Sequence, residues 1–125
     1  MNLKDFTGVE YINLITYKKD KTPITTPVWV ADFSNSLVIT TSLNAGKVKR
    51  VRNNGQATIY ITNQSGSKKL SESIDLKASL IEDVDLKKQA ADLIRKKYGM
   101  MAKMIMKGPD ENRAIIKLVE KGGEE

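Results

Sequence analysis

Apolar and polar residues alternate with a two-residue period along most of the first 82 residues, which predicts β-strands. Residues 11–19 are rich in β-branched and aromatic side chains and run into the turn-like sequence Lys-Lys-Asp-Lys-Thr-Pro. Residues 23–33 alternate in the same way. Because Pro27 cannot donate a ladder hydrogen bond, we expect this second strand to be bent or unpaired at its middle.

Three further segments continue the strand pattern. Residues 36–43 follow the Ser-rich turn at residues 34–36, residues 56–63 form a fourth strand, and residues 70–82 form a long fifth strand with one polar face. A sixth strand is predicted over residues 113–121.

The period changes to that of a helix at Asp85. Apolar residues then recur at i, i+4, i+7 and i+8, which is typical of an amphipathic helix. Gly99 fits the position after the helix C-cap. A Met-rich stretch, residues 100–106, follows this helix, and we expect the tail at residues 122–125 to be frayed. The residues that form the helical stripe are Leu86, Ala90, Leu93 and Ile94.

Six short strands with tight turns, one short helix and one amphipathic helix predict a mainly β fold. We expect a six-stranded antiparallel β-barrel with its helices packed outside. The 125 residues suit one domain, residues 1–125. A small barrel leaves strand edges and apolar outer surface to be covered, so a homodimer is expected.

Composition removes several classes of chemistry. The chain has no cysteine and no histidine. Disulfides, Ser-His-Asp and Cys-His nucleophiles, His-ligated haem and nearly all zinc sites are therefore excluded. Any reaction at this protein is expected to depend on a bound cofactor.

Net charge and hydropathy narrow the choice of partner. The formal charge of +6 favours nucleic acid, an acidic membrane surface or a phosphorylated small molecule. No apolar run approaches the roughly 20 residues that cross a bilayer, and the N-terminus lacks the features of an export signal. We expect a cytoplasmic protein without a membrane-spanning segment.

A cationic segment, residues 42–54 (SLNAGKVKRVRNN), follows the third strand and is predicted to be a short helix. Val48 and Val51 form its apolar face. Gly46 lies at its start, where free backbone N–H groups and the positive end of the dipole favour an anion, and Lys47 adds a charge in the first turn. A solvated helix face is the alternative interpretation. The cations form two pairs, Lys47 with Arg50 and Lys49 with Arg52.

The order of these segments resembles the split β-barrel flavin- and deazaflavin-binding proteins related to pyridoxamine 5′-phosphate oxidase, in particular the small branch of coenzyme F-420-dependent enzymes. The matching stretches are YINLITY (11–17), Asp20 with Pro23, TPVW (26–29), LVITT (37–41) and GKVKRVRN (46–53). Two turn positions depart from the family pattern, since Lys21 replaces a common glycine and Gly55 a common proline.

The resemblance implies a split barrel of the FMN-binding type. It implies that a flavin-type cofactor, FMN or the deazaflavin coenzyme F-420, lies across a homodimer interface and that a hydride passes to a small organic substrate. Lys47 and Arg50 would hold the cofactor phosphate, with Lys49 helping there or on a longer anionic tail. The other implied binding residues are Thr40, Thr41 and Gly46 near the phosphate and Thr26, Pro27, Val28 and Trp29 on the ring-binding strand.

The sequence is also compatible with other functions. The chain is alternatively a non-catalytic flavin- or haem-binding protein, or a basic barrel that binds single-stranded nucleic acid. The second alternative is less favoured because aromatic residues are only 6% of the chain and none lies in the cationic segment. Trp29 is either a packing residue or a ring-stacking residue, and the Met-rich stretch is either packing material or a cover for the site. The sequence selects no catalytic residue and no metal ligand.

Overall fold

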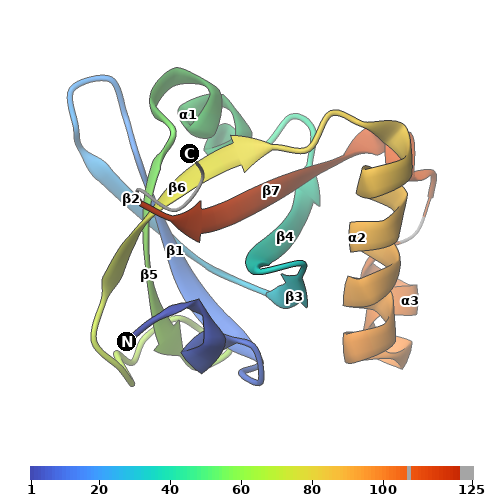
Figure 1. Ribbon diagram of the computed structural model, residues 1–125, viewed down its shortest axis with the longest axis horizontal. Helices are drawn as coiled ribbons and strands as arrows, with labels where there is room; N and C mark the ends of the chain where they lie inside the picture. The colour runs from blue at the N-terminus through green and yellow to red at the C-terminus, as the bar shows by residue number, and fades with distance from the viewer. Residues whose placement is uncertain (107, 122–125) are drawn as a thin grey trace.

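A computed structural model describes residues 1–106 and 108–121 of the protein (Figure 1). In this part of the chain, seven strands form one antiparallel sheet in the order β2-β1-β5-β6-β7-β4-β3, which curls into an open barrel. The strands are β1 (Tyr11–Tyr17), β2 (Pro23–Val28), β3 (Ala31–Phe33), β4 (Ser36–Ser42), β5 (Gln56–Thr62), β6 (Ile74–Leu80) and β7 (Arg113–Glu120). The helices are α1 (Gly46–Asn54), α2 (Val84–Tyr98) and α3 (Met100–Ile105), with 3-10 turns η1 (Leu3–Phe6) and η2 (Asp110–Asn112).

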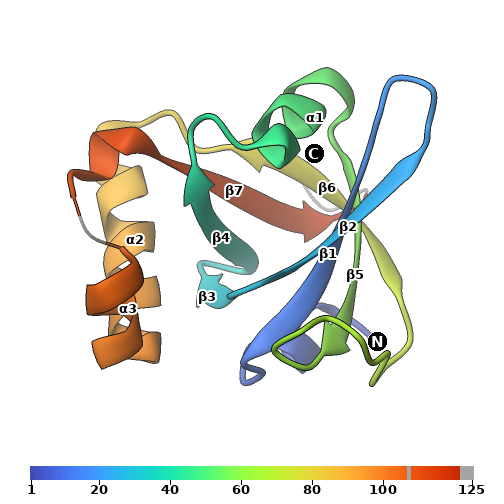
Figure 2. The same ribbon diagram turned by 180° about the vertical axis from the view of Figure 1, so that it is seen from behind.

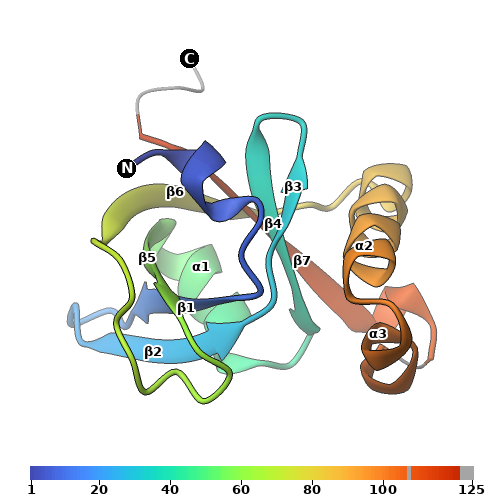
Figure 3. The same ribbon diagram turned by 90° about the horizontal axis from the view of Figure 1, so that it is seen from below.

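Two apolar clusters hold these elements together. Alternate residues of the strands fill the barrel interior, where Leu14 of β1 lies opposite Thr26 of β2 and Ile59 of β5. On the other face of β4 and β7, Val38 and Ile115 pack against α2 and α3. Figure 3 shows these two helices side by side along one flank of the barrel. The predicted mainly β barrel with external helices is therefore confirmed.

The second predicted strand is in fact two strands, so the sheet has seven strands and not six. The break lies at Trp29 and Val30, not at Pro27. Pro27 remains in register opposite Asn13, which an edge strand permits because one row of its N–H groups needs no partner in the sheet. The break occurs because β2 and β3 form opposite edges of the open sheet, and the chain must leave one edge to reach the other.

The predicted fifth strand begins at Ile74 and not at residue 70. Before it, the Leu70 N–H donates to the carbonyl of Ile61 at 2.9 Å, and the Ile61 N–H donates to the Ser71 hydroxyl at 2.9 Å. These contacts hold residues 70 and 71 in a connecting loop, and the Leu70 side chain is 57% exposed. Hydrophobic alternation alone does not distinguish such a loop from a strand.

The predicted bounds of the amphipathic helix agree with the structure more closely than those of the second and fifth strands. The amphipathic helix α2 begins one residue before Asp85, where the side chain of Asp83 accepts a hydrogen bond from the Leu86 N–H at 3.0 Å. It ends at Tyr98 with Gly99 at the C-cap, one position before the one expected for this glycine. The Met-rich stretch forms the short helix α3, which the pattern did not predict. The tail at 122–125, expected to be frayed, lies outside the described residues.

Candidate functional site

The predicted cationic helix is α1, which follows β4 and lies across one end of the barrel (Figure 2). Val48 and Val51 are its buried residues, and Val51 joins the barrel core. The helix ends at Asn54, and its C-cap Gly55 has a left-handed φ of 68° and donates its N–H to the Val51 carbonyl at 2.9 Å. The valines therefore hold the helix against the barrel, and its cations are left on its other sides.

The N-terminus of α1 has neither a side-chain cap nor an acidic residue. Ala45 occupies the N-cap position, so no side-chain oxygen accepts a hydrogen bond from the first-turn N–H groups, and the first turn contains no Asp or Glu. Gly46 opens the helix without a Cβ atom. An N-terminus of this kind has the free donors and the positive dipole end that favour an anion.

Two cations meet at this helix end. Lys47 Nζ donates to Thr41 Oγ1 at 3.3 Å, and Arg50 Nε donates to Thr16 Oγ1 at 2.6 Å. A Cβ atom built on Gly46 would lie 2.8 Å from Arg50 Nη1, so the guanidinium lies directly over the helix start. These five residues, from α1, β1 and β4, are called the α1 site below.

The charges of the α1 site are not balanced within it. Among residues 1–106 and 108–121, neither Lys47 nor Arg50 forms an ion pair. Burial, followed by repulsion from Arg50, lowers the pKa of Lys47. Two neighbouring cations at the positive end of a helix make the local electrostatic potential more positive. A bound anion would offset this potential and the repulsion between the two cations.

Lys49 and Thr40 lie apart from the other predicted phosphate residues. Lys49 is exposed and two residues from Lys47, a spacing that places the two side chains on different faces of a helix. Strand alternation puts Thr41 on the barrel side of β4 and Thr40 on the side that packs against α2. The Thr40 hydroxyl is buried without a hydrogen-bond partner in the described part of the chain.

The predicted ring-binding residues lie on β2 and immediately after it. Thr26 faces the barrel and its hydroxyl is buried, again without a partner among the described residues, whereas Pro27 is exposed. Trp29 stacks on Tyr98 of α2 with ring centroids 4.2 Å apart and planes 8° from parallel. One face of the indole is therefore occupied by the protein itself, which supports a packing role for Trp29.

Thr16 is the member of the α1 site that sequence reasoning missed. It belongs to the inner face of β1, together with the fully buried Ile12 and Leu14, and its own exposure is 0%. A lone hydroxyl on an otherwise apolar strand face is the signal that was present in YINLITY. Its partner Arg50 is 34 residues away, so the sequence did not identify the pair.

In the segments 1–106 and 108–121, no group of three or more acidic, histidine or cysteine side chains is arranged to hold a metal ion. None of the helices in the same segments is long and apolar enough to cross a membrane.

The sheet is an open antiparallel split barrel, with the cationic helix α1 bonded to β1 and β4. The chain belongs to the pyridoxamine 5′-phosphate oxidase family, whose model matches residues 3–121. No curated protein matches the chain by sequence.

Solved structures with the same fold carry different descriptions. A conserved hypothetical protein of Mycobacterium tuberculosis has a TM-score of 0.75 and 14% identity, over 97% of this chain and 81% of the other. The haem storage protein HutZ of Vibrio cholerae has a TM-score of 0.73 and 17% identity, over 97% and 89% of the two chains. An F420 reductase has a TM-score of 0.58 and 16% identity, over 88% and 85%. Identities this low establish the shared fold and not a shared activity.

Proposed function

We propose that this protein is an oxidoreductase that binds FMN or the deazaflavin coenzyme F-420 and transfers a hydride to a small organic acceptor. The observation that carries the proposal is the pair of unbalanced cations, Lys47 and Arg50, over the uncapped N-terminus of α1. Membership of the pyridoxamine 5′-phosphate oxidase family and the structural similarity to an F420 reductase support the choice of cofactor class.

The residues present fit a cofactor that has a phosphate and a polar ring system. Gly46, Lys47 and Arg50 would hold the phosphate, since amide donors at a helix start combine there with two cations. The hydroxyls of Thr16 and Thr41 hold the cations in place. Residues assigned from the family resemblance complete the proposal: Lys49 for a longer anionic tail, and Thr26, Pro27, Val28 and Trp29 for the ring, whereas Thr40 lies on the α2 side of β4, away from the α1 site.

The composition of the chain determines what the cofactor would supply and what the protein would supply. When bound, the flavin or deazaflavin ring supplies the hydride chemistry that a chain without histidine or cysteine lacks. The protein binds and orients the cofactor and keeps water from it. The edge strand β2 has sheet partners on one side only, so we propose that a second copy of the chain covers the ring in a homodimer.

The second candidate is a flavin- or haem-binding protein without turnover, which the structural similarity to HutZ favours. A haem held by this chain would lack the histidine or cysteine ligand that most haem proteins provide. The two candidates differ in whether the reduced, bound cofactor is oxidised by an added organic acceptor.

The proposal is tested by titrating the purified protein with FMN, coenzyme F-420 and haemin, and by repeating the titrations with Lys47→Ala and Lys49→Ala. We expect Lys47→Ala to weaken binding of the phosphate-bearing cofactor by about 1.5–3 kcal/mol, which is the range for a charge-assisted hydrogen bond. For FMN, which has no longer anionic tail, Lys49→Ala is the matched control on another face of the same helix and should cost less. Equal affinity for the wild type and Lys47→Ala would place the phosphate elsewhere.

Turnover and partner class are tested separately. Anaerobic oxidation of the reduced cofactor by a panel of small organic acceptors is expected for the oxidoreductase, and its absence would favour the binding protein. Sedimentation analysis measures the proposed dimer. Tight oligonucleotide binding with a steep salt dependence would instead support the nucleic-acid alternative.

A further inference from the structure

The C-terminal end of α2 contacts the barrel through a lysine whose ammonium group donates only to backbone carbonyls. Lys97 Nζ lies 3.2 Å from the carbonyl oxygen of Thr7, 2.6 Å from that of Val9 and 2.5 Å from that of Val30. An ammonium group has three protons, so these three contacts use its full donor capacity. Burial lowers the pKa of Lys97, while the charge of Glu10 opposes the shift.

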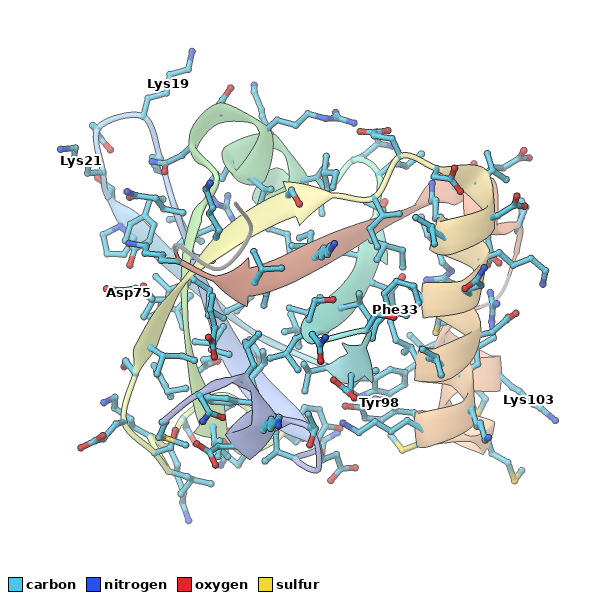
Figure 4. The ribbon with its side chains drawn as sticks, viewed as in Figure 1. Lys19, Lys21, Phe33, Asp75, Tyr98 and Lys103 are labelled. Carbon is cyan, nitrogen blue, oxygen red and sulfur yellow. The ribbon has the colours of Figure 1, made fainter. Side chains whose placement is uncertain are left out.

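Tyr98, the next residue, contacts the same two chain segments. Its hydroxyl accepts a hydrogen bond from the Val30 N–H at 2.9 Å and donates to the Glu10 carbonyl at 2.6 Å. Its ring stacks on Trp29. Figure 4 shows Tyr98 pointing from α2 towards the barrel, whereas Lys103 of α3 points away from it. Lys97 and Tyr98, with these partners, are called the α2 clamp below.

The two segments that the α2 clamp joins are the open ends of one β-hairpin. Residues 7–10 lead into β1, and residues 29 and 30 follow β2. The two strands are paired up to Ile12 opposite Val28, next to the clamp. At its other end the hairpin is closed by the turn at residues 18–22, where the Lys18 N–H donates to the Thr22 carbonyl at 3.0 Å.

The clamp matters most for β2, because β2 is an edge strand. On one side it is held by β1, and no described strand pairs with its other side. The position of its last residues, which are those assigned to the ring, therefore depends on what holds Trp29 and Val30. Although Lys97 is exposed overall, its ammonium group gives up part of its hydration to contact three carbonyls, a cost that apolar contacts would not carry. What the hydrogen bonds add is a defined position for the Val30 backbone.

We propose that Lys97 and Tyr98 are positioning residues for the cofactor ring, acting through the backbone of Trp29 and Val30 at the end of β2. This inference rests on the proposed function, because it concerns the ring part of the same site. It assigns the two ends of the cofactor to different elements: α1 holds the phosphate, and α2 sets the strand on which the ring lies.

The experiment compares two probes, FMN and riboflavin, which share a ring but differ in the phosphate. Tyr98→Phe keeps the stacked ring and removes only the hydroxyl. Lys97→Met keeps a side chain of similar length and removes its charge. We expect each variant to weaken both probes by about tenfold and to alter the visible spectrum of the bound flavin. Lys47→Ala should weaken FMN and leave riboflavin unchanged.

Lys96→Met is the matched control, because Lys96 is the neighbour of Lys97 on the same helix and is likewise exposed, but it has no such bonds to carbonyls in the described part of the chain. It should bind both probes like the wild type. Hydrogen exchange gives a readout without ligand: Tyr98→Phe should speed exchange of the amides at residues 28–30 and leave those of α1 unchanged. Should Lys97→Met fail to fold, Tyr98→Phe alone decides the question.

The outcomes separate the two proposals. If the wild type binds FMN and riboflavin, and Tyr98→Phe binds both with the same affinities and the same flavin spectrum, the clamp does not position the ring and the inference is overturned. If the wild type binds neither probe nor coenzyme F-420, the proposed function is overturned, and the inference that rests on it is overturned as well.

Discussion

Arg50 of α1 donates a hydrogen bond from Nε to the hydroxyl of Thr16 on β1 at 2.6 Å. Thr16 is fully buried on a strand face that is otherwise apolar. This bond links the cationic helix to the barrel wall and holds the guanidinium over Gly46. The position of one charge in the α1 site thus depends on Thr16, whose own side chain is fully buried in the barrel.

Replacing Thr16 by valine tests this relationship. Valine has nearly the same shape, so the barrel core should remain filled, while Arg50 loses the acceptor that orients it. We expect weaker FMN binding by about 0.5–1.5 kcal/mol, measured by fluorescence titration, with little change in unfolding free energy. Thr58→Val is the control, since Thr58 is also buried but bonds to Asp75 at 2.7 Å. Equal loss of FMN affinity in both variants would contradict the prediction.

Gly46→Ala should separate stability from binding. The φ of Gly46 lies outside the left-handed region, so alanine is permitted there and should stabilise the fold by about 0.4–1 kcal/mol. Its Cβ would lie 2.8 Å from Arg50 Nη1, so the guanidinium must move and FMN affinity should fall. Gly8→Ala, where nothing lies within 4 Å of the new Cβ, should leave FMN affinity unchanged. Chemical denaturation and FMN titration of both variants measure the two effects.

Anion binding at the α1 site should weaken at alkaline pH. Burial and Arg50 lower the pKa of Lys47 from 10.5 in the free protein, and a bound anion would raise it again. Affinity for FMN should therefore be constant while Lys47 is protonated in both states, and should fall as pH rises through the lowered pKa of the free protein. Lys47→Arg provides the comparison, because arginine stays charged. Titrations between about pH 7 and 10 should show a fall for the wild type that the arginine variant lacks.

The pH dependence of the contribution of Lys47 to folding stability is opposite to that of its contribution to FMN binding. Because its pKa is lower in the folded state than in the unfolded state, the unfolded chain binds more protons in the interval below pH 10.5. Stability of the cofactor-free protein from this residue should rise with pH across that interval. If affinity and stability instead fell together, general alkaline unfolding would explain the loss of binding.

The β1–β2 turn contains a residue in a conformation that favours glycine. Lys21 has a φ of 71°, and its N–H donates to the Lys18 carbonyl at 2.8 Å. Figure 4 shows Lys19 and Lys21 at the exposed tip of this hairpin. We expect Lys21→Gly to stabilise the protein by about 0.5–1 kcal/mol in urea denaturation. Lys19→Gly, whose backbone lies outside the left-handed region, should destabilise it by a similar amount.

Periodicity predicted the kind and order of most elements. The strand pattern of residues 11–17 and 36–42 reflects a local requirement to bury one face. Of the predicted stripe of α2, Ala90 and Ile94 are buried, whereas Leu86 and Leu93 are exposed. The errors arose where distant contacts decide the outcome. Residues 23–33 alternate throughout, but the chain must cross from one sheet edge to the other at Trp29 and Val30. Residues 70 and 71 alternate too, but they bond to Ile61 as a loop.

Some features of the candidate site could likewise be predicted from local sequence, and others could not. Local sequence was sufficient to place Lys47 and Arg50 together at the start of a helix, because residues three apart share a helix face. The absence of histidine and cysteine was also evident from the sequence, and it indicated that any reaction would depend on a bound cofactor. Only the tertiary structure paired Arg50 with Thr16 and brought Lys97 to Val30, contacts that span 34 and 67 residues. Such pairs depend on how the sheet curls and where α2 packs, which a local pattern does not encode.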